Sequence, residues 1–212
     1  MKSKTTARGR KTNLELREAS IQQIRKSALK LFVTRGYFAT TMEQIAAGAK
    51  LTKGGVYFYV PKKESLLMDI LESIEHSYFA AAFDAIQKLD VSFKEKIVRL
   101  LHWQVTYALK SPQHIMLLVM MSVELSGKSD EPAKRIEEIY RNLHTFVQRT
   151  IQAGKEAGEI KTRLPPREMA SFYIAAHDGM MLEWYRRQRD ISGESLVRVF
   201  RELFIGGLDA YQ

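Results

Sequence analysis

Residues 52–59 carry the side chains whose types and spacing best suit a defined chemistry, and that chemistry is contact with a nucleic acid. Thr52, Lys53, Tyr57 and Tyr59 bring one ammonium and three hydroxyl groups into eight residues. An ammonium group can bond guanine or a phosphate, and tyrosine hydroxyls most often bond phosphate. Tyr57 could instead pack inward as a core residue.

Two glycines and two helix starts extend this candidate interface. Gly54 and Gly55 each cost about 1 kcal/mol of helix propensity relative to alanine, and close approach of the backbone to DNA is a physical reason to accept that cost. A poorly formed helix in the absence of DNA is the alternative. Thr41 and Lys63 lie at expected helix starts, whose free N–H groups favour phosphate. The predicted DNA-binding residues are Thr41, Thr52, Lys53, Gly54, Gly55, Tyr57, Tyr59 and Lys63.

A helix-turn-helix is the element that would position these side chains. Thr41 and Gln44 have the spacing of a capping box, which predicts a short helix over 41–49. Thr52 is suited to cap a second helix after the turn. A second helix whose side chains are polar, small or aromatic is suited to lie in the major groove of DNA.

The same stretch resembles the signature of the TetR/AcrR-type transcriptional regulators over residues 17–70. The agreeing positions are Phe32, Gly36, Tyr37, Thr40, Thr41, Ile45, Ala46, Leu51, Thr52, Lys53, Gly54, Tyr57, Tyr59, Lys63, Glu64 and Leu66. Lys50, Gly55 and Val60 depart from the pattern, and Gly55 has no side chain for reading a base. The resemblance implies a homodimer on a double-stranded DNA operator, usually a repressor, that leaves when a small-molecule effector binds.

The charge distribution supports an interface with phosphate at one end of the chain. Residues 1–64 hold 14 Lys and Arg against 4 Asp and Glu, a net charge of +10, whereas residues 65–212 have a net charge of −1. A basic patch confined to one module is typical of nucleic-acid binding. Residues 1–13 are basic and without periodicity, so we expect a flexible arm. Its Arg8, Arg10 and Lys11 could reach phosphates or a minor groove, and a disordered tail without a specific contact is the alternative.

The rest of the chain predicts helices only. An apolar stripe over 16–35, ended by Gly36, forms the floor of the helix-turn-helix, and Pro61 is expected to begin a long helix to Gln87. Further helices are expected over 92–110, 114–125, 131–157, 165–189 and 192–210. We therefore predict an all-α protein of about nine helices, with an arm (1–13), a three-helix DNA-binding domain (14–64) and a helical effector-binding and dimerisation domain (65–212).

Large aromatic and methionine side chains in residues 100–185 are candidates for lining an apolar ligand cavity. Methionine fills irregular space and tolerates variable partners. An ordinary helical core would have the same composition, but the family resemblance implies an effector pocket here. The predicted ligand-binding residues are Trp103, Tyr107, Met120, Phe146, Tyr173, His177 and Met181.

The last two helices are expected to form the dimer interface, because the family resemblance implies a four-helix bundle between subunits. Small residues there permit close helix approach. The predicted interface residues are Gly179, Glu183, Phe200 and Phe204. A twofold pair would present its recognition helices to half-sites about 34–36 Å apart.

Catalytic, metal and membrane functions find little support. The five histidines lack metal-ligand spacing, and no cysteine is present for zinc or a disulfide. We expect no cofactor, no metal, no catalysis and no membrane partner, since no apolar run is long enough for a bilayer. A cytoplasmic regulator is the favoured reading. An architectural DNA-binding protein without effector, or a helical enzyme or carrier, stays open.

Overall fold

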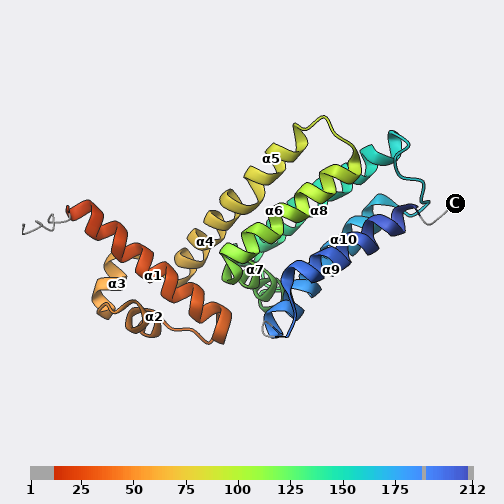
Figure 1. The fold of residues 1–212 in the computed structure, drawn as a ribbon. Coiled ribbons are helices and arrows are strands. Elements are labelled where there is room, and N and C mark those ends of the chain that lie inside the picture. Colours follow the sequence, from red (N-terminus) through yellow and green to blue (C-terminus); the bar gives the residue numbers. More distant parts are fainter. Residues whose placement is uncertain (1–11, 188–189, 210–212) are drawn as a thin grey trace, which may run out of the picture.

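The computed structural model describes residues 12–187 and 190–209, and these residues are helical or in short connections, without a strand. Residues 1–11 of the predicted arm (1–13) lie outside the described residues, whereas Thr12 caps α1 and Asn13 is its first residue, so the arm ends earlier than predicted. Figure 1 shows helices α1–α3 at one end of an elongated molecule and the later helices beyond them. The elements are α1 Asn13–Arg35, α2 Met42–Ala49, α3 Lys53–Tyr59, α4 Lys63–Ile74, η1 Glu75–Ala80, α5 Ala81–Gln87, α6 Phe93–Lys110, α7 Pro112–Glu124, α8 Glu131–Glu156, α9 Pro166–Arg186 and α10 Gly193–Asp209.

The predicted all-α class and number of helices are confirmed. Because α4, η1 and α5 follow one another without a break, they form one continuous helix, and the described residues contain nine such rods. Within that long helix, η1 is a π-helical turn, a feature that is frequent at functional sites. The indole N–H of Trp103 in α6 donates to the carbonyl of Tyr78 in η1 at 2.9 Å.

The helix-turn-helix forms because its two caps and its turn are encoded locally. The Thr41 hydroxyl accepts from the backbone N–H of Gln44, and the Gln44 side chain accepts from the N–H of Thr41, which completes the predicted capping box. Thr52 caps α3 by accepting from the N–H of Gly55 at 3.0 Å. Lys50 takes the left-handed conformation between the two helices, with φ 58°.

The start of the long helix differs from the prediction. Pro61 was expected as its first residue, but α4 begins at Lys63 and Lys62 is the extended N-cap residue. Val60 is also extended, so residues 60–62 form a short spacer between α3 and α4. Because of this spacer, Lys63 lies beside the connection between α1 and α2 and donates to backbone carbonyls of that connection.

The core runs through both ends of the molecule. Ile24, Phe32 and Val56 are buried in the N-terminal part, while Leu67 and Leu71 of α4 are buried where this helix packs against the later helices. None of the helices in the described part of the chain combines the length and hydrophobicity that crossing a bilayer requires.

Candidate DNA interface and ligand cleft

Helix α3 presents polar and aromatic side chains to solvent and buries only Val56. Tyr57 is 41 % exposed and Phe58 is 81 % exposed, so Tyr57 lies on the surface and does not pack into the core. Tyr59 is half-buried and packs against the core. Phe58 is therefore the most exposed large apolar side chain of the interface, and the sequence reasoning did not select it, because an isolated phenylalanine carries no polar signal.

Lys53 is exposed and pairs with Glu43 of α2. The Lys53 ammonium lowers the pKa of the Glu43 carboxyl to about 2, with the Glu43 backbone N–H as the next cause. The ion pair joins the two helices of the motif across the face expected to meet DNA. A phosphate that binds Lys53 would therefore compete with Glu43.

The two glycines of α3 differ in their surroundings. A Cβ added to Gly54 would meet nothing within 4 Å, so the backbone is open to solvent there. A Cβ added to Gly55 would lie 3.1 Å from the Thr52 hydroxyl, which caps the helix. Neither residue offers a side chain to a base, and the exposed longer side chains of α3 are those of Lys53, Tyr57 and Phe58.

Lys63 is engaged inside the protein. Its ammonium donates to the carbonyls of Tyr37 at 2.6 Å and Thr40 at 2.7 Å, and it lies 4.4 Å from the centre of the Tyr37 ring. Burial lowers the pKa of Lys63, and the Glu124 carboxylate partly offsets that effect. One of its three N–H groups remains for the phosphate contact predicted for this residue. Thr41 is exposed beside it.

Glu124, the last residue of α7, holds the same connection from the other side. Its carboxylate accepts from the backbone N–H groups of Tyr37 at 2.9 Å and Phe38 at 2.8 Å. We call residues 36–40 the docking turn. A Cβ on Gly36 would lie 3.1 Å from this carboxylate, and the positive φ of 89° at Gly36 also favours glycine. The docking turn is thus held by α7 through its N–H groups and by α4 through its carbonyls.

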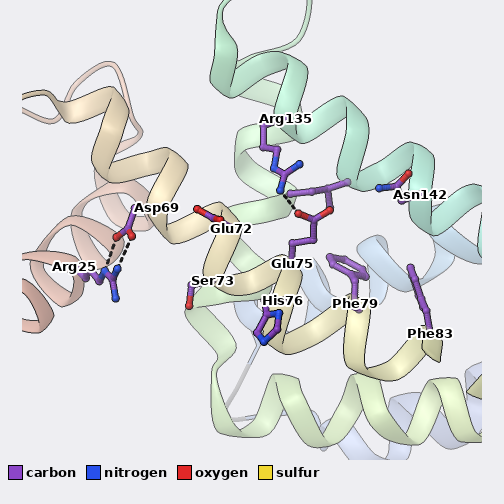
Figure 2. A pocket seen from close by; sticks show the side chains of 12 residues that line it. Arg25, Asp69, Glu72, Ser73, Glu75, His76, Phe79, Phe83, Arg135 and Asn142 are labelled. Atoms are coloured by element: carbon purple, nitrogen blue, oxygen red, sulfur yellow. Dashed lines mark hydrogen bonds and ion pairs between the residues drawn. The ribbon is translucent and has the colours of Figure 1, made fainter. Parts of the chain in front are cut away.

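An ion pair also joins α1 to α4, and it lies at the border of a large cleft. Arg25 makes a two-pronged ion pair with Asp69. Figure 2 shows this pair at one end of a hollow that runs along α4 and η1, with Arg135 of α8 bound to Glu75 above it. This hollow has a volume of about 650 Å³. The apolar side chains of Phe79 and Phe83 lie on its η1–α5 side.

The hollow continues along α5 and α8 into a second one of about 500 Å³, which shares Phe83 and Asn142 with the first. We call the two together the outer cleft. The Phe83 ring stacks on Phe146 with centroids 4.1 Å apart. Lys96 and Arg149 also line the second hollow, and neither makes an ion pair with a described residue. The outer cleft therefore combines aromatic walls with two cations that make no ion pair among the described residues, and the Glu159 carboxylate lies in the same hollow, where it accepts from the backbone N–H of Phe93.

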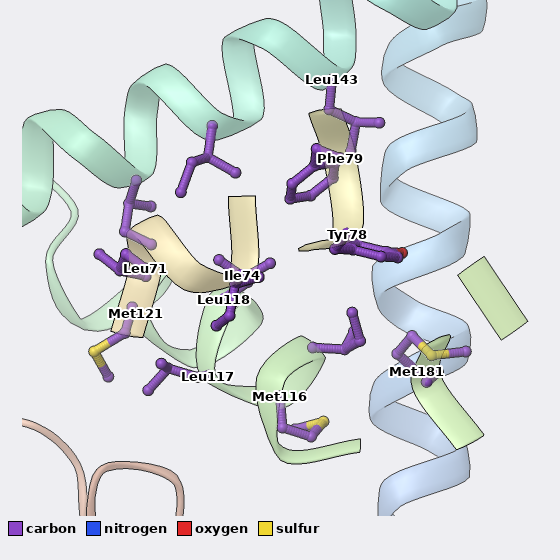
Figure 3. Close-up of a cluster of buried hydrophobic side chains, with 14 of the residues drawn as sticks. Leu71, Ile74, Tyr78, Phe79, Met116, Leu117, Leu118, Met121, Leu143 and Met181 are labelled. Atoms are coloured by element: carbon purple, nitrogen blue, oxygen red, sulfur yellow. The ribbon is translucent and has the colours of Figure 1, made fainter. Parts of the chain in front are cut away.

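Behind Phe79 lies a small space of about 10 Å³, the inner cavity, bounded by η1, α7, α8 and α9. Polar groups meet there: the Tyr140 hydroxyl donates to Asp178 at 3.0 Å, and Nδ1 of His177 lies 3.3 Å from the same carboxylate. Figure 3 shows Tyr78 and Phe79 side by side, with the Tyr78 hydroxyl directed toward α9. Phe79 and Ile139 line both the inner cavity and the outer cleft.

Two of the seven predicted ligand residues line these spaces: Phe146 borders the outer cleft and His177 the inner cavity. Tyr173 is fully buried and its hydroxyl donates to Gln104 at 2.7 Å. The remaining predicted residues line neither space: Trp103, Tyr107, Met120 and Met181. The sequence reasoning missed Phe79, Phe83 and Arg149, because their joint position depends on how the long helix lies against α8.

The predicted dimer residues have mixed placements. Phe200 and Phe204 are buried within the protomer, where both rings contact Tyr173 edge to face with centroids 5.4 Å apart. Gly179 is exposed on α9 and Glu183 is half-buried. The exposed apolar side chains of α9 and α10 are instead Phe172, Val199 and Leu203.

Comparison with known proteins places these features in a family. Residues 24–70 match the family model described as bacterial regulatory proteins of the tetR family, and residues 90–208 match the tetracyclin repressor-like C-terminal domain. The chain is 26 % identical over 191 residues to the transcriptional repressor DhaR of Mycobacterium sp. (strain GP1), covering 86 % of this chain and 91 % of DhaR. It is 22 % identical over 186 residues to the fatty acid metabolism regulator protein of Bacillus subtilis (strain 168), covering 88 % and 94 %.

Solved structures agree with the fold. The MbdR regulator from Azoarcus sp. CIB is 33 % identical with a TM-score of 0.81, covering 91 % of this chain and 99 % of MbdR. FadR from Bacillus subtilis in complex with stearoyl-CoA has a TM-score of 0.69 at 20 % identity, covering 90 % and 99 %. AibR in complex with isovaleryl coenzyme A and operator DNA has a TM-score of 0.71 at 18 % identity, covering 87 % and 97 %. The last two show likeness of fold alone.

Proposed function

The chain belongs to the TetR family of bacterial regulatory proteins, which are DNA-binding transcriptional regulators, and on this premise we propose that it is a repressor released from its operator by an acyl thioester of coenzyme A. The observation that carries the proposal is the outer cleft, which places stacked aromatic side chains beside two cations without ion-pair partners. An acyl thioester has the matching parts, an apolar chain and a polyanionic nucleotide.

Two structural neighbours support this effector class. FadR was solved with stearoyl-CoA and AibR with isovaleryl coenzyme A. In the proposed complex, Lys96 and Arg149 bind the phosphates of the nucleotide. From there the thioester end of the effector is directed past Phe83 toward Phe79, since these rings supply the apolar walls of the cleft.

DNA binding is proposed to come from α3 of two copies related by a twofold axis. Lys53, Tyr57 and Tyr59 contact the operator, with Thr52, the two glycines and the helix starts at Thr41 and Lys63 near phosphates. The apolar surface of Phe172, Val199 and Leu203 on α9 and α10 is exposed in the single chain, and Leu203 is 72 % exposed. We propose that this surface, with Gly179 and Glu183 beside it, pairs with a second copy.

Coupling between the two sites is proposed to pass through the docking turn. The helices that border the inner cavity include the long helix and α7, and each also contacts this turn, through Lys63 and through Glu124. A ligand that moves these helices apart would shift the docking turn and hence the spacing of the two α3 helices. Release then follows from a lower affinity of the shifted dimer for its half-sites.

The proposal is tested by titrating isovaleryl-CoA and stearoyl-CoA, with free coenzyme A as control, against the protein bound to a fluorescent operator. At saturation, at least one thioester is expected to weaken operator binding by about fivefold or more, the lower end of usual allosteric coupling. Arg149→Ala should need more thioester for release, whereas Arg141→Ala, on an exposed site of the same helix, should not. Release by neither compound would refute the effector class.

A further inference from the structure

The hydroxyl of Tyr78 is the one buried side-chain polar atom among the described residues that has no hydrogen-bond partner. Its side chain is fully enclosed, with a relative exposure of 2 % for the residue. Leaving a buried hydroxyl unpaired costs about 1–3 kcal/mol. Phenylalanine would fit the same place without that cost, so the hydroxyl calls for a functional explanation.

The neighbouring polar groups already have partners. The Tyr140 hydroxyl donates to Asp178, and the Oε1 of Gln104 accepts from Tyr173. Gln104 lies near Tyr78 and acts to lower its pKa, against the larger effect of burial, but the Tyr78 hydroxyl makes no hydrogen bond with it. Burial, together with the charge of Asp178, raises the Tyr78 pKa far above its ordinary value. Tyr78 is therefore a neutral donor with nothing to donate to.

The position of Tyr78 relates this donor to the outer cleft. Tyr78 lines the inner cavity, and its chain neighbour Phe79 separates that cavity from the outer cleft, since Phe79 lines both. Both residues belong to the π-helical turn η1, so a movement of this turn displaces both together.

We propose that the inner cavity is the acyl subsite of the effector, which opens when Phe79 swings aside, and that the Tyr78 hydroxyl donates a hydrogen bond to the thioester carbonyl. This inference rests on the proposed function and names the group that the effector must carry. The ligand oxygen is neutral, because the Asp178 carboxylate in the same cavity would repel an anion. A carbonyl accepts without needing to donate, which complements the one free donor.

The size of the cavity selects a short acyl group. Its volume of about 10 Å³ is close to the space that one water requires, so an acyl group enters only as side chains move. The buried methionines Met116 and Met181, drawn in Figure 3, belong to the surrounding core and can adapt their shape. Isovaleryl-CoA demands less displacement than stearoyl-CoA and is the probe of choice.

The test is a double-mutant cycle between the protein hydroxyl and the ligand carbonyl. Wild type and Tyr78→Phe are each titrated with isovaleryl-CoA and with its thioether analogue S-(3-methylbutyl)-CoA, which lacks only the carbonyl oxygen. Wild type should bind the thioester about three- to tenfold more tightly than the thioether, the range for one neutral hydrogen bond. Tyr78→Phe should bind both equally, because the donor is absent.

The thermal melts of the free proteins provide the second readout. Tyr78→Phe should melt at or above the temperature of wild type, because its only lost group was unpartnered. A lower melting temperature would mean that the hydroxyl has a structural partner and would overturn the proposal. Equal preference of both proteins for the thioester, or no binding of isovaleryl-CoA by an operator-binding wild type, would also overturn it. If the wild-type protein binds no operator at all, the proposed function itself is refuted.

Discussion

Truncation of Glu124 is expected to loosen the docking turn and uncouple the effector from DNA. In Glu124→Ala, the N–H groups of Tyr37 and Phe38 lose the carboxylate that accepts from them at 2.9 and 2.8 Å. Hydrogen bonds to a charged group contribute about 1.5–3 kcal/mol each when buried. Because the hydrogen bond from the Phe38 N–H is exposed to solvent, we take about 2 kcal/mol for the two hydrogen bonds together. This free energy corresponds to a roughly 30-fold change in the equilibrium between the docking turn held by Glu124 and the released turn.

Amide hydrogen exchange of Tyr37 and Phe38 measures this change directly. Both amides should exchange roughly 30-fold faster in Glu124→Ala than in wild type, by the same arithmetic. In Glu124→Gln, which keeps one acceptor oxygen, the exchange rates of both amides should lie between those of wild type and Glu124→Ala. The control is Glu137→Ala, which removes an exposed carboxylate from α8 and should leave both amides unchanged.

The same variants report on function. In Glu124→Ala, the ratio of operator dissociation constants with and without isovaleryl-CoA should fall toward one, because α7 no longer holds the docking turn. If that ratio and the two exchange rates match those of Glu137→Ala, the reasoning about the docking turn is wrong.

Further expectations concern the DNA-facing surface. Glu43→Gln frees the Lys53 ammonium for a phosphate, so the slope of log affinity against log salt should steepen by about 0.9 per half-site in salt titrations. The Glu43 carboxyl, with its pKa lowered to about 2 from 4.5, stabilises the folded state fully above pH 4.5 and loses this contribution as the pH falls toward 2, which an NMR titration of the carboxyl follows. We expect the exposed Phe58 ring to contact the methyl group of a thymine in the operator. Phe58→Ala should therefore weaken operator binding. Replacing that thymine by uracil should weaken wild-type binding by about fourfold, the worth of one methyl group, without affecting the variant. Gly54→Ala should raise the free energy of unfolding by up to about 1 kcal/mol while weakening operator binding, because its methyl group occupies space that DNA needs; unchanged operator affinity would contradict that close approach.

Local signals explain why the helix-turn-helix could be predicted. The capping box at Thr41 and Gln44, the cap at Thr52 and the positive φ at Gly36 all concern residues within a few positions of one another. The start of the long helix was missed because Pro61 is a good first residue in isolation. The structure begins the helix two residues later, at Lys63, whose ammonium reaches carbonyls 23 and 26 residues away.

The ligand site could be predicted only in outline. Aromatic and methionine content indicated an adaptable interior, but which rings line a space depends on the packing of helices far apart in sequence. Phe200 and Phe204, predicted for the dimer interface, both contact Tyr173 of the same protomer, and Phe204 also stacks on the exposed Phe172. The role of Glu124 also lacks a sequence signal, because its two partners lie 87 and 86 residues away.

Selection of bound duplexes from a random DNA library, at physiological salt and followed by sequencing, tests the central claim most directly. The account predicts enrichment of a near-palindrome with half-sites about 34–36 Å apart, one helical turn, as a twofold dimer requires. Retention of DNA without an enriched sequence would contradict it and identify an architectural DNA-binding protein. No retention, with or without isovaleryl-CoA and stearoyl-CoA, would contradict DNA regulation by this chain.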